Sequence, residues 1–183
     1  MNTLKINREE AVLVLVDFQE RLMPAMKGHG DLEEAVVKLV KGCRILEVPI
    51  LVTQQYTKGL GPTIPRIHEA LGDYEPVEKT AFSAMGEPVF KEVLKKTGRK
   101  TVILAGIEAH VCVLQTALDL IDAGYTVFLV NDCVASRSNS DRKFAQRRIA
   151  ESGAVGTTYE SVLFEILKGA REEGFKEISS LVK

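Results

Sequence analysis

Short apolar runs alternate with helical patterns along almost the whole chain, and this alternation limits the possible folds more than any other feature. Four runs are rich in Val, Ile, Leu and Ala and are bounded by polar or glycine residues, as buried strands are. They are residues 11–18, 48–54, 100–107 and 125–132. Strands that alternate with helices predict a parallel sheet covered by helices on both faces, with right-handed crossovers.

The segments between and after these strands carry apolar residues at helical spacing. The predicted helices are residues 31–47, 87–98, 110–124 and 140–153, followed by two short ones at 159–167 and 172–182. Three of them reach a glycine, the commonest residue just past a helix C-terminus. Weaker strands are predicted near 75–80 and 154–159. The stretch 54–76, rich in proline and glycine, is predicted to be irregular and to form a lid or pocket wall.

Length and composition favour a single globular domain over residues 1–183. The formal net charge of -1 offers no field for gathering nucleic acid or anionic lipid, so neither partner is expected. The N-terminal segment does not resemble a signal peptide, and no run reaches membrane-spanning length. The three cysteines have unrelated spacings, which predicts neither a disulfide framework nor a zinc site. A reducing cytoplasm is the expected location.

Three residues with reactive side chains follow predicted strands. Asp17 closes the first strand, Lys79 ends the weak strand near 75–80, and Cys112 lies where the strand 100–107 gives way to a helix. In an open parallel sheet, the carboxyl ends of the strands form the ligand crevice, so these side chains are expected to meet at one edge. Each also has a structural interpretation: Asp17 as a turn cap, Lys79 as a solvated surface residue and Cys112 as a small buried apolar residue.

Together, the three side chains predict an activated nucleophile. A helix N-terminus and a neighbouring lysine both favour a thiolate at Cys112, and Asp17 could accept the thiol proton. Backbone N–H groups in the turn "GIEAHVC" could hold an oxyanion on an attacked carbonyl.

The chain resembles the isochorismatase-like cysteine hydrolases, which include nicotinamidases and N-carbamoylsarcosine amidohydrolases. The resemblance rests on "VLVLVDFQ" with Asp17, "VEKTAFSA" with Lys79 and "VILAGIEAHVCVLQTALDLIDAGYTVFLVNDCVASRS" with Cys112, and continues through "DRKFAQRRIAESGAVGTTYESVLFEIL". It therefore covers nearly the whole chain. It implies an α/β fold of three layers, α/β/α, around a mainly parallel six-stranded sheet, and a homo-oligomer.

The resemblance also implies a catalytic triad of Asp17, Lys79 and Cys112, with a cis peptide bond between Ile107 and Glu108. The N–H groups of Glu108 and Cys112 would then form the oxyanion hole. The implied reaction is hydrolysis of a C–N bond in a small amide-like substrate through a thioester, with Asp17 as base and Lys79 holding the charged partners.

Two features depart from named members of the family. Nicotinamidases carry an Asp-x-His pair after the second strand and a further histidine that bind a metal, whereas this chain has "TQQYTKG" there. Gln54, Gln55 and Tyr56 are poor metal ligands, so no metal and no other cofactor are expected. Isochorismatases hydrolyse a vinyl ether without a cysteine nucleophile, so Cys112 argues against that activity. Vinyl ether hydrolysis and a non-catalytic binding or scaffold role remain the alternatives.

Other residues receive weaker interpretations. Phe18, Gln54 and His110 are candidates for lining the substrate pocket because they lie beside the predicted strand ends or the nucleophile. Cys43 and Cys133 are expected to be packing residues.

Overall fold

The computed structural model describes residues 4–183, and its centre is a six-stranded, all-parallel sheet in the order β3-β2-β1-β4-β5-β6. The strands are β1 (Ala11–Val16), β2 (Ile50–Gln55), β3 (Val77–Lys79), β4 (Thr101–Ile107), β5 (Thr126–Ala135) and β6 (Val155–Thr157). The four main strands and both weaker ones predicted from the sequence are present. The predicted α/β fold class is therefore confirmed.

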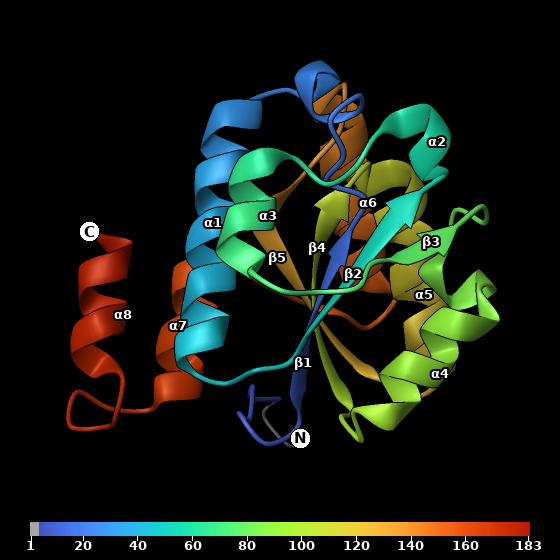
Figure 1. Cartoon of the computed structure of the whole chain (residues 1–183). Coiled ribbons are helices and arrows are strands. Elements are labelled where there is room, and N and C mark those ends of the chain that lie inside the picture. The colour runs from blue at the N-terminus through green and yellow to red at the C-terminus, as the bar shows by residue number, and fades with distance from the viewer. Residues whose placement is uncertain (1–3) are drawn as a thin grey trace.

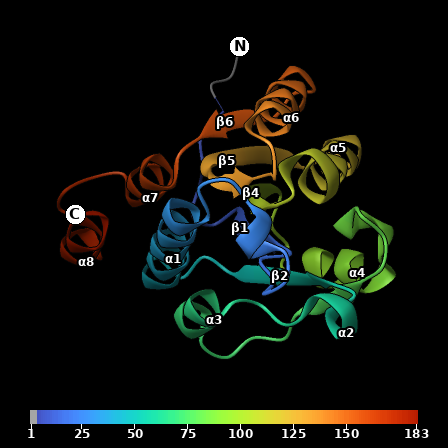
Figure 2. The same ribbon diagram turned by 90° about the horizontal axis from the view of Figure 1, so that it is seen from above.

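Helices cover both faces of this sheet, giving three layers (Figures 1 and 2). One face carries α1 (His29–Ile45), α3 (Pro65–Leu71) and α7 (Tyr159–Leu167), with α8 (Phe175–Val182) packed on the outer side of α1 and α7. The other face carries α4 (Pro88–Lys96), α5 (Leu114–Asp122) and α6 (Asn139–Glu151). In β1, Leu13 and Leu15 pack into one core while Val12 and Val14 pack into the other. A strand buried on both faces needs an unbroken apolar run, which explains "VLVLV".

Two segments differ from the sequence predictions. The stretch 54–76 was predicted to be irregular, which is wrong, because it contains α2 (Thr57–Leu60) and α3. Pro65 starts α3 at a position where a helix tolerates proline, and Ile67 buries that helix against the core. Strand β5 continues past its predicted end to Ala135, because Val134 and Ala135 resume pairing with β4 after a bulge.

The register of the central strands brings distant residues to the carboxyl edge of the sheet. Val16 pairs with both Thr53 and Gly106, and Gln55 pairs with Lys79. Strand pairing therefore brings the ends of β3, β2, β1 and β4 to the same edge of the sheet, with β2 and β1 between β3 and β4. Within residues 4–183, no helix has both the length and the apolar character needed to cross a membrane.

Candidate active site

Asp17 is held in one orientation at the end of β1. Its φ of 58° lies in the left-handed region, which aspartate adopts more readily than most residues. The backbone N–H of Asp17 donates to the Thr53 carbonyl at 3.2 Å, and the Thr53 hydroxyl donates to Asp17 Oδ1 at 2.7 Å. The side chain is fully buried. Strand β2 thus fixes both the backbone and one carboxylate oxygen of Asp17.

Lys79 lies buried against that carboxylate. Its Nζ is 2.7 Å from Asp17 Oδ2 and donates hydrogen bonds to Gln55 Oε1 at 2.6 Å, the Phe82 carbonyl at 3.0 Å and the Ala81 carbonyl at 3.2 Å. An ammonium group has only three N–H donors, and here it faces four acceptors. The contact to Asp17 Oδ2 is an ion pair that lacks hydrogen-bond geometry, so among the described residues Oδ2 accepts no hydrogen bond. This oxygen keeps its capacity to accept a proton.

Cys112 lies next to both charges, on a π-helical turn (Ala109–Val113) that leads into α5. Burial, followed by the charge of Asp17, raises the pKa of the Cys112 thiol to about 12, while Lys79 acts in the opposite direction. The expectation that the surroundings favour a thiolate was therefore wrong in its net direction, because desolvation outweighs the lysine. The resting group is a neutral thiol, and a base must take its proton before it can attack.

The strand before the cysteine approaches β1 closely. A Cβ atom added at Gly106 would lie 2.6 Å from Val16 Cβ and 2.7 Å from the Val16 carbonyl oxygen, so only glycine fits. The peptide bond between Ile107 and Glu108 is cis. The Glu108 carboxylate accepts hydrogen bonds from the Arg137 backbone N–H at 3.1 Å and its Nε at 3.0 Å, which ties the turn to the end of β5.

Three supporting residues were not singled out from the sequence. Thr53 orients Asp17, and Gln55 accepts from Lys79. Gln19 holds Gln55 in turn: its Oε1 accepts from the Gln55 N–H at 2.7 Å, and its Nε2 donates to the Gln55 carbonyl at 3.0 Å. The polar run "TQQ" at the end of an apolar strand was a usable signal for Thr53 and Gln55, because strand ends supply the site in this fold.

The proposed pocket residues lie near the triad but have structural partners. Phe18 packs in the hydrophobic core and is 1% exposed. Gln54 donates to Thr63 Oγ1 at 3.0 Å and accepts from the Thr57 hydroxyl at 3.0 Å. His110 Nδ1 lies 2.9 Å from Ser136 Oγ. All three therefore shape the walls around the strand ends, and contact with a substrate stays a prediction.

The other two cysteines of the chain lie apart from this site. Cys43 and Cys133 are fully buried free thiols, and burial raises the pKa of both. In the part of the chain from residue 4 onward, no group of three or more His, Cys, Asp or Glu side chains could hold a metal ion.

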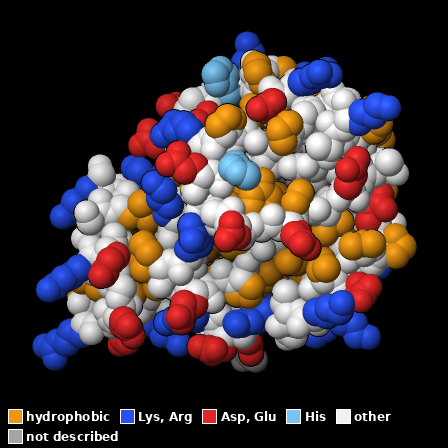
Figure 3. All heavy atoms as spheres, viewed as in Figure 1, with side chains coloured by type: hydrophobic (Ala, Val, Ile, Leu, Met, Phe, Trp, Pro, Cys, Tyr) orange, Lys and Arg blue, Asp and Glu red, His pale blue; other side chains and the backbone are white. Residues whose placement is uncertain are grey.

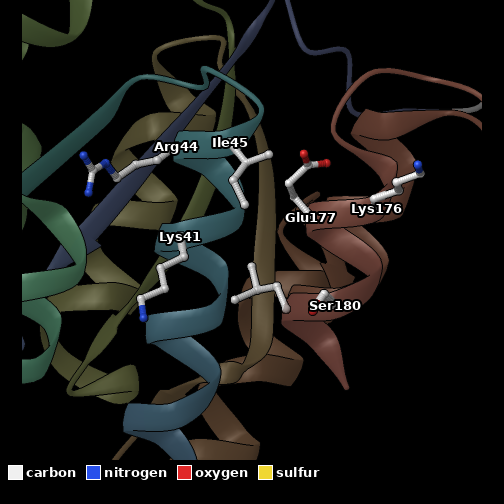
Figure 4. Close-up of a pocket in the computed structure, with 7 residues that line it drawn as sticks. Lys41, Arg44, Ile45, Lys176, Glu177 and Ser180 are labelled. Atoms are coloured by element: carbon white, nitrogen blue, oxygen red, sulfur yellow. The ribbon is translucent and has the colours of Figure 1, made fainter.

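A hollow of large volume lies elsewhere on the molecule, away from Asp17, Lys79 and Cys112. A hollow of about 850 Å³ lies between α1 and α8, where Ile45 and Glu177 face each other (Figure 4). Arg44 points away from α8 and donates to the Ala70 carbonyl at 2.9 Å. No triad residue lines this hollow. The triad is instead almost closed in the single chain, with Cys112 only 8% exposed.

Comparison with known proteins gives a consistent result. A family model described as "Isochorismatase domain" matches residues 11–161. The chain is 38% identical over 178 residues to Isochorismatase domain-containing protein 2 of Danio rerio, which covers 97% of this chain and 89% of that protein.

Two solved structures share the fold over nearly the whole chain. MAR1 ribonuclease of Caenorhabditis elegans has a TM-score of 0.91 at 40% identity, covering 98% of this chain and 92% of that one. The YcaC gene product of Escherichia coli, described as an octameric hydrolase of unknown specificity, has a TM-score of 0.93 at 24% identity, covering 99% of this chain and 90% of that one.

Proposed function

This chain belongs to the isochorismatase family of hydrolases, and we propose that it is a cysteine hydrolase that cleaves a C–N bond of a small amide-like substrate. One observation carries the proposal. A buried thiol, Cys112, lies beside the Asp17 carboxylate, whose Oδ2 touches Lys79 yet accepts no hydrogen bond from the described residues. In the proposal, Oδ2 is the oxygen that accepts the thiol proton.

The proposed reaction has two halves. Asp17 Oδ2 takes the Cys112 proton as the sulfur bonds to the substrate carbonyl carbon. The tetrahedral intermediate then collapses, the C–N bond breaks, and protonated Asp17 gives its proton to the departing ammonia or amine. Asp17 next takes a proton from water, whose oxygen attacks the thioester. The product carboxylic acid leaves, and the proton returns to Cys112.

The neighbouring groups have supporting roles in this scheme. The Lys79 ammonium offsets charge on Asp17, and its contacts with Gln55 and two carbonyl groups keep it from swinging away. The Thr53 hydroxyl occupies Asp17 Oδ1, so Oδ2 is the oxygen that acts as base. Backbone N–H groups of Glu108 and Cys112 are the proposed donors to the oxyanion, where one such donor typically contributes about 10²- to 10³-fold in rate.

A small substrate suits this site better than a polymer. Asp17 and Lys79 are fully buried, and Cys112 is nearly so. Blue and red side chains are interspersed on the face in Figure 3, without a single-sign patch there. RNA cleavage is the second candidate because the 40% identical neighbour is called a ribonuclease. An RNA substrate would need a positively charged track on the protein surface, which the net charge of -1 does not favour.

The test compares ammonia release from a panel of small primary amides and carbamoyl compounds by wild type, Cys112→Ala and Cys43→Ala. The thioester scheme predicts turnover by wild type and Cys43→Ala, none by Cys112→Ala, and an acyl adduct on Cys112 seen by intact mass. Ammonia release that survives in Cys112→Ala would reject the scheme. Cleavage of single-stranded RNA that depends on Cys112, without amide turnover, would favour the second candidate.

We also propose self-association and a cytoplasmic location. The Escherichia coli neighbour is described as octameric, which supports self-association of this chain. A free nucleophilic thiol suits a reducing compartment. Light scattering coupled to size-exclusion chromatography tests the first point; a monomer at micromolar concentration would contradict it.

A further inference from the structure

A second hollow, of about 460 Å³, lies between the start of α1, the end of β5 and the start of α6, and several polar side chains line it. We call it the α1/β5/α6 hollow. The charged side chains that line it are Lys27, Asp31, Asp132 and Arg142. None of the triad residues lines it, so it is a separate place on the molecule. Its volume is typical of sites that bind small molecules.

The bulge in β5 places one of these charges. Leu104 of β4 pairs with Leu129, but Gly106 pairs with Val134, so extra residues of β5 loop out of the ladder between them. Asp132 lies in this bulge. Bulges of this kind often re-aim a side chain beside a functional site. Asp132 Oδ1 accepts a hydrogen bond from the Tyr159 backbone N–H at 2.9 Å, and burial raises the pKa of the Asp132 carboxyl group.

Arg142 brings the opposite charge to the same hollow. Its Nε is buried and has no hydrogen-bond partner among residues 4–183. Buried polar atoms in folded proteins almost always have a partner, so an orphan N–H on a side chain that lines a hollow indicates a missing acceptor. A guanidinium group recognises a carboxylate through two parallel hydrogen bonds, with Nε as one donor.

The two charges share the hollow without pairing. Ion pairs elsewhere in the chain close to within 4.0 Å, but neither Arg142 nor Asp132 takes part in one among the described residues. Lys27 and Asp31, which are exposed at the rim of the hollow, also carry opposite charges and form no ion pair with each other. We propose that the α1/β5/α6 hollow binds a small zwitterion, with the carboxylate on Arg142 and the ammonium group on Asp132, as in an ω-amino acid.

The balance of charges selects this ligand class. A simple anion would pair with Arg142 but would face Asp132, and a simple cation would have the reverse problem. A ligand carrying both groups satisfies the orphan Nε and the half-buried carboxylate at once. The inference does not depend on the proposed amide hydrolysis, because it uses none of the residues of the triad.

The test is a titration of ¹⁵N-labelled full-length protein with glycine, β-alanine and γ-aminobutyrate, following backbone amide resonances. Propionate and propylamine are the probes with one charge each. We expect at least one ω-amino acid to shift resonances of residues 27–35 and 132–142 saturably, with an affinity at least about tenfold above that of either single-charge probe. Propionate binding as tightly as its matched amino acid, or shifts confined to the surroundings of Cys112, would overturn the proposal.

Variants localise the two ends of the ligand. Arg142→Gln and Asp132→Asn should each weaken binding at least about tenfold, because each removes one charge-assisted contact. Arg147→Gln is the matched control, since Arg147 is exposed on the same helix, does not line the α1/β5/α6 hollow, and pairs with Glu151 and the ring of Phe144. If one of these two variants fails to fold, the affinity of the other still tests whether the ligand binds in the hollow. Unchanged affinity in a folded variant of either residue would overturn the assignment of that end.

Discussion

Two places near the carboxyl edge of the sheet gather charges of both signs, and they handle them in opposite ways. At the triad, Asp17 and Lys79 touch at 2.7 Å in a fully buried site. In the α1/β5/α6 hollow, Asp132 and Arg142 share a space and do not pair. Direct pairing fixes side chains for a reaction, while separation leaves room for a ligand that carries the missing charges. The two sites should therefore respond differently to pH and to mutation.

The largest expected effect concerns the exclusion of water from the triad, which is measured by the rate at which the Cys112 thiol is alkylated. With a pKa of about 12, Cys112 is almost wholly protonated at pH 8, so alkylation by iodoacetamide should be slow. Because only the thiolate reacts, the rate should rise about tenfold per pH unit, or roughly 100-fold from pH 8 to 10. Mass spectrometry of the Cys112 peptide measures this.

Asp17→Asn sharpens the alkylation experiment. The Asp17 charge raises the pKa of Cys112, so its removal should lower that pKa and speed alkylation at pH 8, while Lys79→Met should slow it. A rate that levels off near pH 8 in the wild type, as for an ordinary thiol, would show that the site is wetter than the geometry indicates.

The second prediction removes one partner of the buried pair. Lys79→Met leaves the Asp17 carboxylate buried without its opposite charge, so the free energy of unfolding should fall by about 3–5 kcal/mol. Urea denaturation measures it, and amide turnover should be lost. Adding Asp17→Leu to Lys79→Met should recover part of the loss, because the orphan charge is gone. No recovery in the double variant would contradict this account of the pair.

The third prediction addresses the orientation of Asp17. Thr53→Val keeps the shape but removes the 2.7 Å hydrogen bond to Asp17 Oδ1, which should lower stability by about 1.5–3 kcal/mol, because the acceptor is charged. Thr57→Val is the control, since that hydroxyl donates to the neutral Gln54 at 3.0 Å and should contribute about 0.5–1.5 kcal/mol. Equal losses would mean that the Asp17 charge adds nothing to the bond.

The smallest effect is expected in the hollow. Arg142→Met removes a charge that has no partner among the described residues, so stability should change by no more than about 0.5 kcal/mol. Urea denaturation beside Lys79→Met gives the direct comparison. A loss near that of Lys79→Met would show that Arg142 is a structural residue, and the contrast between the two places would disappear.

Much of the fold could be predicted because local pattern and tertiary packing agree. The run "VLVLV" predicts a strand buried on both faces, and β1 packs into both cores. Strand β5 was predicted too short because Asn131 and Asp132 interrupt its apolar run, and only pairing with β4 shows that it continues. The segment 54–76 was predicted to be irregular because proline and glycine hid two short helices, of which α3 is stabilised by burying Ile67.

By itself, the sequence determined the order of strands and helices and which side chains follow the strands, since both depend on local patterns. It therefore identified Asp17, Lys79 and Cys112 as a group. Only the tertiary structure decided the state of that group: burial made Cys112 a protonated thiol, and strand pairing brought Thr53 and Gln55 to orient the two charges. Desolvation and hydrogen-bond geometry depend on everything packed around a residue, and no local pattern contains that information.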